Sequence, residues 1–312
     1  MRLNLELFKE KLVYFLVCGS LLSDKIGEIK SDRTSGASQI ARNALGVLRF
    51  FTQTSKHVTC RSFKEDFIEV SRKLFEIRYN MASVQNLVTQ IAYEVGTLEE
   101  NDLNFVRKFA ACRIDKLCKD SEVAANKCAE GAATIIGDFD CLASCSDSST
   151  VCKSFGVAKR MGRKFKVYVA ESKSGDGSFR YGKVMTDFLT SINIHAEVFN
   201  DNEIRKYLSY AKCVLVGADS ILCDEAVING KPTLELAVVA TEYGIPIYSV
   251  CETSKANTLS YLGKKVDLKK GFDLTPGNLI TGIITENGTL DANAIVEIMK
   301  NRSKFFEIFD IR

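Results

Sequence analysis

The spacing of apolar residues changes near residue 134, and this change limits the folds that the chain can adopt. Up to about residue 125, apolar side chains recur every three or four residues, as amphipathic helices require. From about residue 134, short β-rich runs alternate with amphipathic stretches of helical period. This alternation predicts a parallel sheet with helices on both faces. We therefore expect an α/β protein with an all-helical N-terminal domain, 1–128, and an α/β domain, 129–312.

The predicted elements follow from these periods. The N-terminal helices are expected at Gln39–Phe51, Phe63–Glu76, Val84–Val95 and Asn104–Cys128. The strands are expected at Phe139–Ser144, Phe165–Glu171, His195–Phe199, Cys213–Gly217, Ile245–Glu252 and Leu279–Thr285. The intervening helices are expected at Thr150–Met161, Tyr181–Ser191, Glu203–Tyr210 and Leu234–Tyr243. Most of the strands are almost continuously apolar, as strands covered on both faces must be.

The charge balance excludes some partners. Of 312 residues, 42 are Lys or Arg and 39 are Asp or Glu, so the net charge is +3. A net charge so close to zero does not indicate an extended basic surface that would bind nucleic acid. It is compatible with a local basic pocket. The apolar stretch Leu12–Leu22 is too short to span a bilayer and is interrupted by Gly19 and Ser20. We expect neither a direct nucleic-acid partner nor membrane attachment.

Cysteine and histidine usage points to a reducing compartment. There are eleven cysteines, an odd number, and two histidines, with no Cys-x-x-Cys pair. No secretory signal pattern precedes the cysteines, so we expect free thiols in the cytoplasm rather than a disulfide framework. The ligand spacing of a structural zinc site is missing, and we expect no metal. No residue is evident that would complete a catalytic Ser–His–Asp or Cys–His arrangement with either histidine, so an enzyme of that type is disfavoured.

A polar run, Ser144–Thr150, follows the first predicted strand and enters a helix. In open α/β sheets, ligands bind at the carboxyl ends of the strands. Hydroxyls and free backbone N–H groups at a helix N-terminus suit a phosphate. The alternative is a simple helix cap, which accounts for one or two of these seven residues.

Three other strand ends carry carboxylates, namely Glu171, Asp219 and Glu252, and Lys173 and Lys255 lie close to two of them. An Asp just past a buried strand is well placed as a general acid or base, because burial raises its pKa. A turn or helix cap is the alternative for Asp219. The convergence of three strand ends is more informative than any single residue.

The helical part contributes a second candidate, the segment Asp32–Ser38 before the first predicted helix. Gly36 and Ala37 allow close backbone approach, Ser38 can cap the helix, and Arg33 adds a planar charged group. An ordinary helix start is the alternative. The chain contains neither a Walker motif nor a Gly-x-Gly-x-x-Gly motif.

The order and spacing of several motifs resemble one family. The matching segments are Asp32–Ala41, Arg78–Leu87, Cys145–Val151, Tyr168–Lys173, Val214–Asn229, Val250–Lys255 and Phe272–Gly288. They are similar to the alpha, beta and delta subunits of initiation factor 2B, a family that includes methylthioribose-1-phosphate isomerase and ribose-1,5-bisphosphate isomerase. The resemblance implies a Rossmann-like C-terminal domain for ligand binding and dimerisation. It also implies a sugar phosphate or nucleotide between the two domains, and dimers or larger assemblies.

The resemblance also implies roles for individual residues. Gly36 and Ala37 fall in the phosphate-binding loop, Asp219 in the position of the isomerases' catalytic acid or base, and Arg78 in that of a substrate-binding arginine. The predicted ligand-binding residues are Arg33, Gly36, Ala37, Ser38, Arg78, Ser148, Glu171, Lys173, Asn229, Lys231 and Lys255. Lys173 replaces an arginine of the isomerase motif, which keeps the charge but removes the bidentate fork.

The catalytic cysteine of the isomerases has no certain counterpart. Alignment on Ser148 places Ser146 at its position, whereas alignment on the preceding strand places Cys145 there. A shift of one residue at a strand end reverses the side-chain direction. If the chain is an isomerase, the catalytic residues are therefore Asp219 with Cys145 or Ser146. A serine needs an activating base, and none is evident.

Two functions follow. The first is an initiation factor 2B-like regulatory subunit that binds a sugar phosphate or nucleotide and acts on initiation factor 2 or related subunits. The second is an aldose–ketose isomerase of ribose 1,5-bisphosphate or 5-methylthioribose 1-phosphate. Neither requires a cofactor. An assembly partner that has lost both roles is a third possibility.

Overall fold

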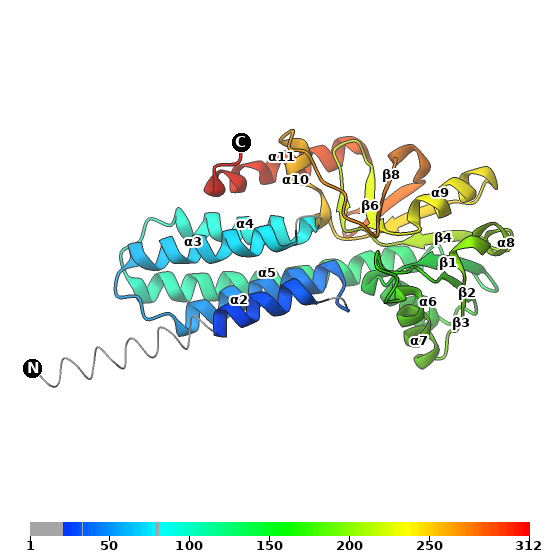
Figure 1. Ribbon diagram of the computed structural model, residues 1–312, viewed down its shortest axis with the longest axis horizontal. Helices are drawn as coiled ribbons and strands as arrows, with labels where there is room; N and C mark the ends of the chain where they lie inside the picture. Colours follow the sequence, from blue (N-terminus) through cyan, green and yellow to red (C-terminus); the bar gives the residue numbers. More distant parts are fainter. Residues whose placement is uncertain (1–20, 33, 79–80) are drawn as a thin grey trace, which may run out of the picture.

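The computed structural model describes residues 21–32, 34–78 and 81–312. The molecule is elongated, with a bundle of long helices at one end and a twisted sheet flanked by helices at the other (Figure 1). This arrangement confirms the expected order of a helical N-terminal region followed by a largely parallel sheet.

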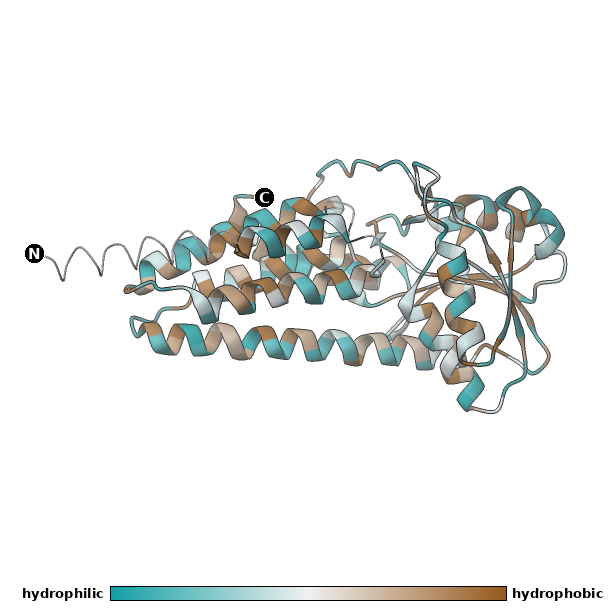
Figure 2. Cartoon of the chain, turned by 60° about the horizontal axis from the view of Figure 1, so that its bottom comes forward, coloured by the Kyte–Doolittle hydropathy of each residue, from teal (hydrophilic) through white to brown (hydrophobic). Residues whose placement is uncertain are grey.

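The long helices pack around a core of aromatic and aliphatic side chains that includes Phe63 and Phe67. They are α2 (Ala37–Thr54), α3 (Cys60–Ile77), α4 (Ala82–Gly96) and α5 (Leu103–Ala133). Apolar and polar residues alternate around each helix, as Figure 2 shows. Asp102 caps the N-terminus of α5, because its carboxylate accepts a hydrogen bond from the backbone N–H of Asn104.

The main sheet has seven strands in the order β10-β9-β7-β4-β1-β2-β3, parallel except for β10. The strands are β1 (Cys141–Cys145), β2 (Lys166–Ala170), β3 (His195–Phe199), β4 (Cys213–Val216), β7 (Ile247–Val250), β9 (Gly282–Thr285) and β10 (Gly288–Leu290). The helices around it are α6 (Ser149–Arg160), α7 (Tyr181–Ser191), α8 (Ile204–Leu208) and α9 (Thr233–Glu242). One apolar cluster joins the sheet to α6 and α7, and another joins it to α8 and α9.

Several elements were not expected from the sequence. A small antiparallel sheet contains β5 (Ser220–Ile221), β6 (Val227–Gly230) and β8 (Phe272–Thr275). The short helices are η1 (Asp201–Glu203), η2 (Thr253–Lys255), η3 (Gly277–Leu279), η4 (Glu307–Phe309) and α10 (Thr258–Tyr261). A long C-terminal helix, α11 (Ala292–Phe306), returns to the helical bundle, where Phe306 packs against Phe75 with ring centroids 6.0 Å apart.

The two parts share elements. Helix α5 runs without interruption through residue 128, and its last turns join the apolar cluster under the sheet. The division of the chain at residue 128 therefore stays a prediction. Over the ranges that the structure describes, no helix is both long enough and apolar enough to cross a membrane.

Candidate functional site

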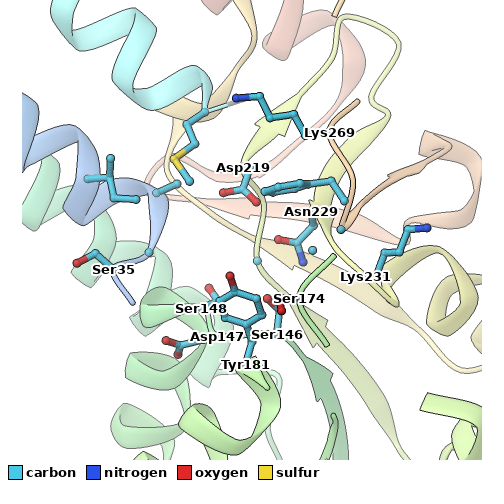
Figure 3. Close-up of a pocket in the computed structure, with 18 of the residues that line it drawn as sticks. Ser35, Ser146, Asp147, Ser148, Ser174, Tyr181, Asp219, Asn229, Lys231 and Lys269 are labelled. Carbon is cyan, nitrogen blue, oxygen red and sulfur yellow. The ribbon is translucent and has the colours of Figure 1, made fainter. Parts of the chain in front are cut away.

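A cavity of about 480 Å³ lies where the carboxyl ends of the parallel strands face the first turn of α2. Its wall comes from the segments after β1, β2, β4 and β6 and from the residues before β8 (Figure 3). Strand ends and a helix start that are far apart in the sequence thus meet at one place, as the topology of an open α/β sheet predicts.

Two helix N-termini open into this cavity. Gly36 is the N-cap of α2, and no side chain caps that helix. Ser148 is the N-cap of α6 and accepts a hydrogen bond from the backbone N–H of Val151, at 3.4 Å. The two starts are adjacent, since a Cβ added at Gly36 would stand 3.3 Å from Ser149 Oγ. Paired helix N-termini present N–H groups and the positive ends of two dipoles, which favours a phosphate.

The Cys145 and Ser146 side chains lie on opposite sides of the wall. Cys145 is fully buried in the cluster under α8 and α9, with Sγ 3.3 Å from Thr233 Oγ1. Burial raises the pKa of the Cys145 thiol to about 12. Ser146 lines the cavity in a left-handed backbone conformation, φ +61°, and its N–H donates to Ser172 Oγ at 2.7 Å. A thiolate nucleophile is therefore not supplied by Cys145 in this conformation.

Four aspartates line the cavity, Asp32, Asp147, Asp176 and Asp219, and two of them have a clearly raised pKa. Burial raises the pKa of Asp219 to about 6, against the opposing charges of Lys255 and Arg78. Burial also raises the pKa of Asp147 to about 6. Groups that titrate near neutral pH can exchange protons with a ligand or accept its hydroxyls. Figure 3 shows the Asp219 carboxylate and the Asn229 amide on the same side of the cavity.

Basic side chains surround the cavity. The lining cations are Lys30, Arg78, Lys173, Lys231, Lys255, Lys269 and Lys270. Lys231 Nζ stands 3.9 Å from Asp273 Oδ1, whereas Lys255 is almost completely buried. This concentration of positive charge contrasts with the near-neutral chain as a whole and favours an anionic ligand.

Arg78 supports the segment that leads to α2. Its guanidinium donates to the carbonyl oxygens of Ile29, at 2.8 and 3.1 Å, and of Asp32. The Asp32 carboxylate in turn accepts hydrogen bonds from the N–H groups of Thr34 and Ser35, each at 2.9 Å. These bonds fix the approach to Gly36, so Arg78 shapes the cavity as well as lining it.

Glu171 lies behind the wall and holds a loop in place. Its carboxylate pairs with Lys173 at 3.0 Å and with Arg180 at 2.7 Å, and it is not among the lining residues. These two partners bracket the loop of residues 173–180. Across the cavity mouth, a Cβ added at Gly175 would stand 3.0 Å from the backbone of Lys270. The structure thus gives Glu171 a role in loop geometry.

The structure brings together most of the predicted ligand-binding residues. Those that line the cavity are Gly36, Ala37, Arg78, Ser148, Lys173, Asn229, Lys231 and Lys255, together with Asp219 and Ser146, which were predicted as catalytic only for an isomerase. Arg33 lies outside the described residues. Ser38 is buried and neither caps α2 nor lines the cavity, because its hydroxyl donates to Glu252 at 2.7 Å.

Among the lining residues that the sequence did not single out by name are Lys30, Asp147, Asp176, Lys269 and Lys270. Asp147 belongs to the polar run Ser144–Thr150, which was predicted as a candidate site without assigning Asp147 a role of its own. The pair Lys269–Lys270 follows a segment for which the sequence predicted no element. The pair lies just before Phe272, the first residue of a segment that resembles the family, and this position could have marked both lysines as site residues.

The helical part, the parallel sheet and the basic cavity between them together define an α/β protein with a cavity suited to an anion. Residues 33–271 match the model of the initiation factor 2 subunit family. The chain therefore belongs to that family, and the predicted resemblance is confirmed.

Named relatives fall into two groups. The chain is 30% identical over 276 residues to a Pyrococcus furiosus translation initiation factor eIF-2B subunit 2-like protein, covering 84% of this chain and 94% of the relative. It is 26% identical over 300 residues to the ribose 1,5-bisphosphate isomerase of the same organism, covering 88% and 91%. A crystal structure of Pyrococcus horikoshii translation initiation factor eIF-2B is similar, with a TM-score of 0.72 and 26% identity, covering 86% of this chain and 96% of that one.

Proposed function

We propose that this protein is an initiation factor 2B-like subunit that binds a phosphorylated sugar or nucleotide as a regulator. In this proposal a phosphate sits at the adjoining N-termini of α2 and α6, and the sugar extends towards Asp219 and Asn229. The lysines at the mouth, Lys173 and Lys269 among them, would attract the ligand and hold a second phosphate.

The observation that favours binding over catalysis is the location of the thiol. None of the described residues that line the cavity is a cysteine, and Cys145, the last residue of β1, is buried against α8 and α9 with a raised pKa. Ser146 occupies the wall instead, and a hydroxyl needs an adjacent base to act as a nucleophile or acid. A pocket that keeps phosphate-binding groups without the thiol suits a regulatory subunit.

One specific observation favours the alternative, an aldose–ketose isomerase. Asp219 lies in the cavity with a pKa of about 6, which suits a group that moves a proton between C1 and C2 of an aldose phosphate. The ribose 1,5-bisphosphate isomerase among the relatives makes that substrate the first to test.

The deciding experiment combines binding and turnover. Ribose 1,5-bisphosphate and 5-methylthioribose 1-phosphate are added separately to the purified protein. Ketose formation is followed by NMR, and thermal unfolding reports binding. The regulatory proposal predicts a raised Tm without turnover. Turnover that Asp219→Asn abolishes would instead establish the isomerase. Neither binding nor turnover would leave only an assembly partner.

We further propose that the protein assembles as a homodimer or larger oligomer through its C-terminal part, in the cytoplasm, and acts on initiation factor 2 or related subunits. Membership of the family supports this proposal. Light scattering of the purified protein, with and without the sugar phosphate, tests the assembly. Co-purification with initiation factor 2 from the same organism tests the partner. A monomer that retains no initiation factor would contradict both.

A further inference from the structure

A buried segment, residues 252–258, brings Lys255 to the wall of the cavity. Asn86 of α4 holds this segment by donating its amide group to the carbonyl oxygens of Ser254, at 2.7 Å, and Ala256, at 2.8 Å. The backbone on both sides of Lys255 is thus fixed by the helical bundle. The lysine has little freedom to move its charge into solvent.

Glu252 and Lys255 form a buried ion pair. Lys255 Nζ stands 3.8 Å from Glu252 Oε2, and the side chains are only 5% and 1% exposed. A buried charge without a partner is strongly unfavourable, so each member of such a pair depends on the other. Only Lys255 of the two lines the cavity.

Glu252 also joins the two helix starts of the anion site. Ser38, in the first turn of α2, donates its hydroxyl to Oε2 at 2.7 Å. Thr150, in the first turn of α6, donates to Oε1 at 3.4 Å. One carboxylate therefore contacts both helices whose N-termini open into the cavity, and the lysine beside them.

The other titratable groups near Lys255 are Asp219, Cys251 and Cys128. Burial raises the pKa of Cys251 to about 12 and raises that of Cys128 further, so both thiols are neutral near pH 7. Burial acts to lower the pKa of Lys255, but Glu252 is the largest of the opposing influences, and the pKa ends above its ordinary value. The carboxylates that act directly on Lys255 are thus Glu252 behind it and Asp219, which also lines the cavity. Glu286 and Arg302 face the same short helix but bind its Thr253: Glu286 accepts from Thr253 at 2.6 and 2.9 Å, and Arg302 donates to it at 3.3 Å.

We propose that Glu252 is a positioning residue for the anion site: its buried carboxylate keeps Lys255 charged at the cavity wall and links the first turns of α2 and α6. A negative charge behind an anion site would by itself weaken anion binding. Here the charge strengthens binding, because Lys255 without Glu252 would lose its ion-pair partner and keep only Asp219 as an anionic neighbour, so it would lose its proton more readily. The contribution to ligand affinity rests on the proposed function, whereas the pairing of the two residues does not.

The first test needs no ligand. Glu252→Gln keeps the shape of the side chain and its ability to accept from Ser38, but removes the ion-pair partner of Lys255. Because the pKa of Lys255 then falls below its unfolded value, the lost stability is largest at neutral pH and is recovered as pH rises towards 10. We expect an apparent Tm about 5 °C below wild type at pH 7.0 and a clearly smaller deficit at pH 9.0.

Two further variants separate charge from packing. Glu252→Gln combined with Lys255→Met removes the charge of the lysine too, so its Tm should return to within about 3 °C of wild type. Ser38→Ala removes one hydrogen bond without changing charge, so its deficit should be the same at both pH values. A Glu252→Gln deficit that is independent of pH and persists in the double variant would overturn the proposal. If the single variant is too unstable to purify, the double variant decides, because it must fold.

The second test measures binding of inorganic phosphate and of ribose 1,5-bisphosphate by calorimetry between pH 7.5 and 9.0. Asp219 is ionised throughout this range. Wild-type affinity should stay nearly constant, whereas affinity of Glu252→Gln should fall about tenfold as Lys255 loses its proton. Equal or tighter binding by the variant at every pH would contradict the proposal. A wild-type protein that binds neither probe would contradict the proposed function, and the unfolding test would still decide the role of Glu252.

Discussion

Gly217 lies directly against Ser148, the residue that caps α6. A Cβ added at Gly217 would stand 2.6 Å from Ser148 Oγ and 2.8 Å from Ser148 Cβ. Real Cβ atoms do not approach other heavy atoms so closely, and rotation of the hydroxyl alone cannot relieve the second contact. The absence of a side chain at the end of β4 is therefore what allows α6 to begin at the cavity.

Substitution of Gly217 by Ala should impair the anion site more than the fold. The added methyl group must displace Ser148 and with it the first turn of α6, so we expect phosphate affinity to fall at least tenfold. Overpacking of this kind costs about 1–3 kcal/mol of stability. Titration calorimetry with inorganic phosphate and chemical denaturation measure the two effects.

Gly156 provides the matched control on the same helix. A Cβ there meets only Arg160 and Ile192, at 3.7 and 3.8 Å, which are ordinary contacts. Gly156→Ala should therefore leave phosphate affinity unchanged and raise stability by up to about 1 kcal/mol. Unaltered affinity in Gly217→Ala would show that Ser148 is not part of the anion site.

Asp219→Asn should make the protein more stable at neutral pH. Burial raises the pKa of Asp219 to about 6, so the folded protein binds this proton more tightly than the unfolded chain does. The stability of the folded protein therefore rises as pH falls from about 6 towards 4. Above pH 6 the buried carboxylate is ionised and destabilises the folded protein by its full amount. The amide removes that cost, and we expect a gain on the order of 2 kcal/mol at pH 7.5.

Denaturation of wild type and variant at several pH values checks this sign. The gain should shrink towards zero near pH 4, where the wild-type carboxyl is protonated in both states. Asp187→Asn on α7 serves as the control, because this carboxylate is exposed and pairs with the exposed Lys183, so its replacement should change stability by less than about 1 kcal/mol. A variant less stable than wild type at pH 7.5 would mean that the attraction of Lys255 and Arg78 for the ionised Asp219 carboxylate outweighs the destabilising effect of its burial.

Glu171→Gln should loosen the loop across the cavity mouth. The carboxylate is mostly buried and pairs with both Lys173 and Arg180, which are themselves at least half exposed. Neutralising it releases both ends of the loop, and opened loops are preferred sites of proteolysis. We expect trypsin to cleave after Lys173 or Arg180 several-fold faster than in wild type, measured by mass spectrometry. Cleavage at an unchanged rate would indicate that the loop is held by its backbone contact with Lys270 instead.

The fold and much of the site could be predicted because they depend on periodicity and topology. Helical spacing fixed the bundle, and alternation of strands with helices fixed the parallel sheet. The rule that strand ends meet at one edge predicted that Glu171, Asp219 and Glu252 converge with Lys173 and Lys255. Asp219 and the two lysines line the cavity, whereas Glu171 and Glu252 do not. These predictions depend on residues that are close together in the sequence and on the rule about strand ends. They do not require knowledge of any side-chain contact between distant residues.

The remainder depends on contacts between distant segments. Strands β5 and β6 have two and four residues, too short to show a period, and α11 was missed although it packs on α4. The bond between Ser38 and Glu252 joins residues 214 positions apart, so Ser38 was assigned to the cap of its own helix. The side to which Cys145 and Ser146 point was open for the same reason, since a single-residue shift in register reverses it.

Gly182 gives a test in which helix propensity and packing predict opposite results. It lies in the first turn of α7, where Ala would ordinarily stabilise a helix by up to about 1 kcal/mol. A Cβ at this position, however, would stand 1.9 Å from the carbonyl oxygen of Ala170, at the end of β2. The atom it meets is backbone within the main sheet, so it cannot move aside without breaking the pairing of β2 with β1 and β3.

Gly182→Ala should therefore destabilise the protein by at least about 3 kcal/mol, or prevent folding altogether, because α7 must lift from the sheet. Chemical denaturation followed by circular dichroism measures the loss, with Gly156→Ala on the neighbouring helix as the control of opposite sign. A Gly182→Ala protein within about 1 kcal/mol of wild type would mean that α7 can slide along β2. The loop 173–180 leads directly into α7, so such sliding would also change the mouth of the cavity.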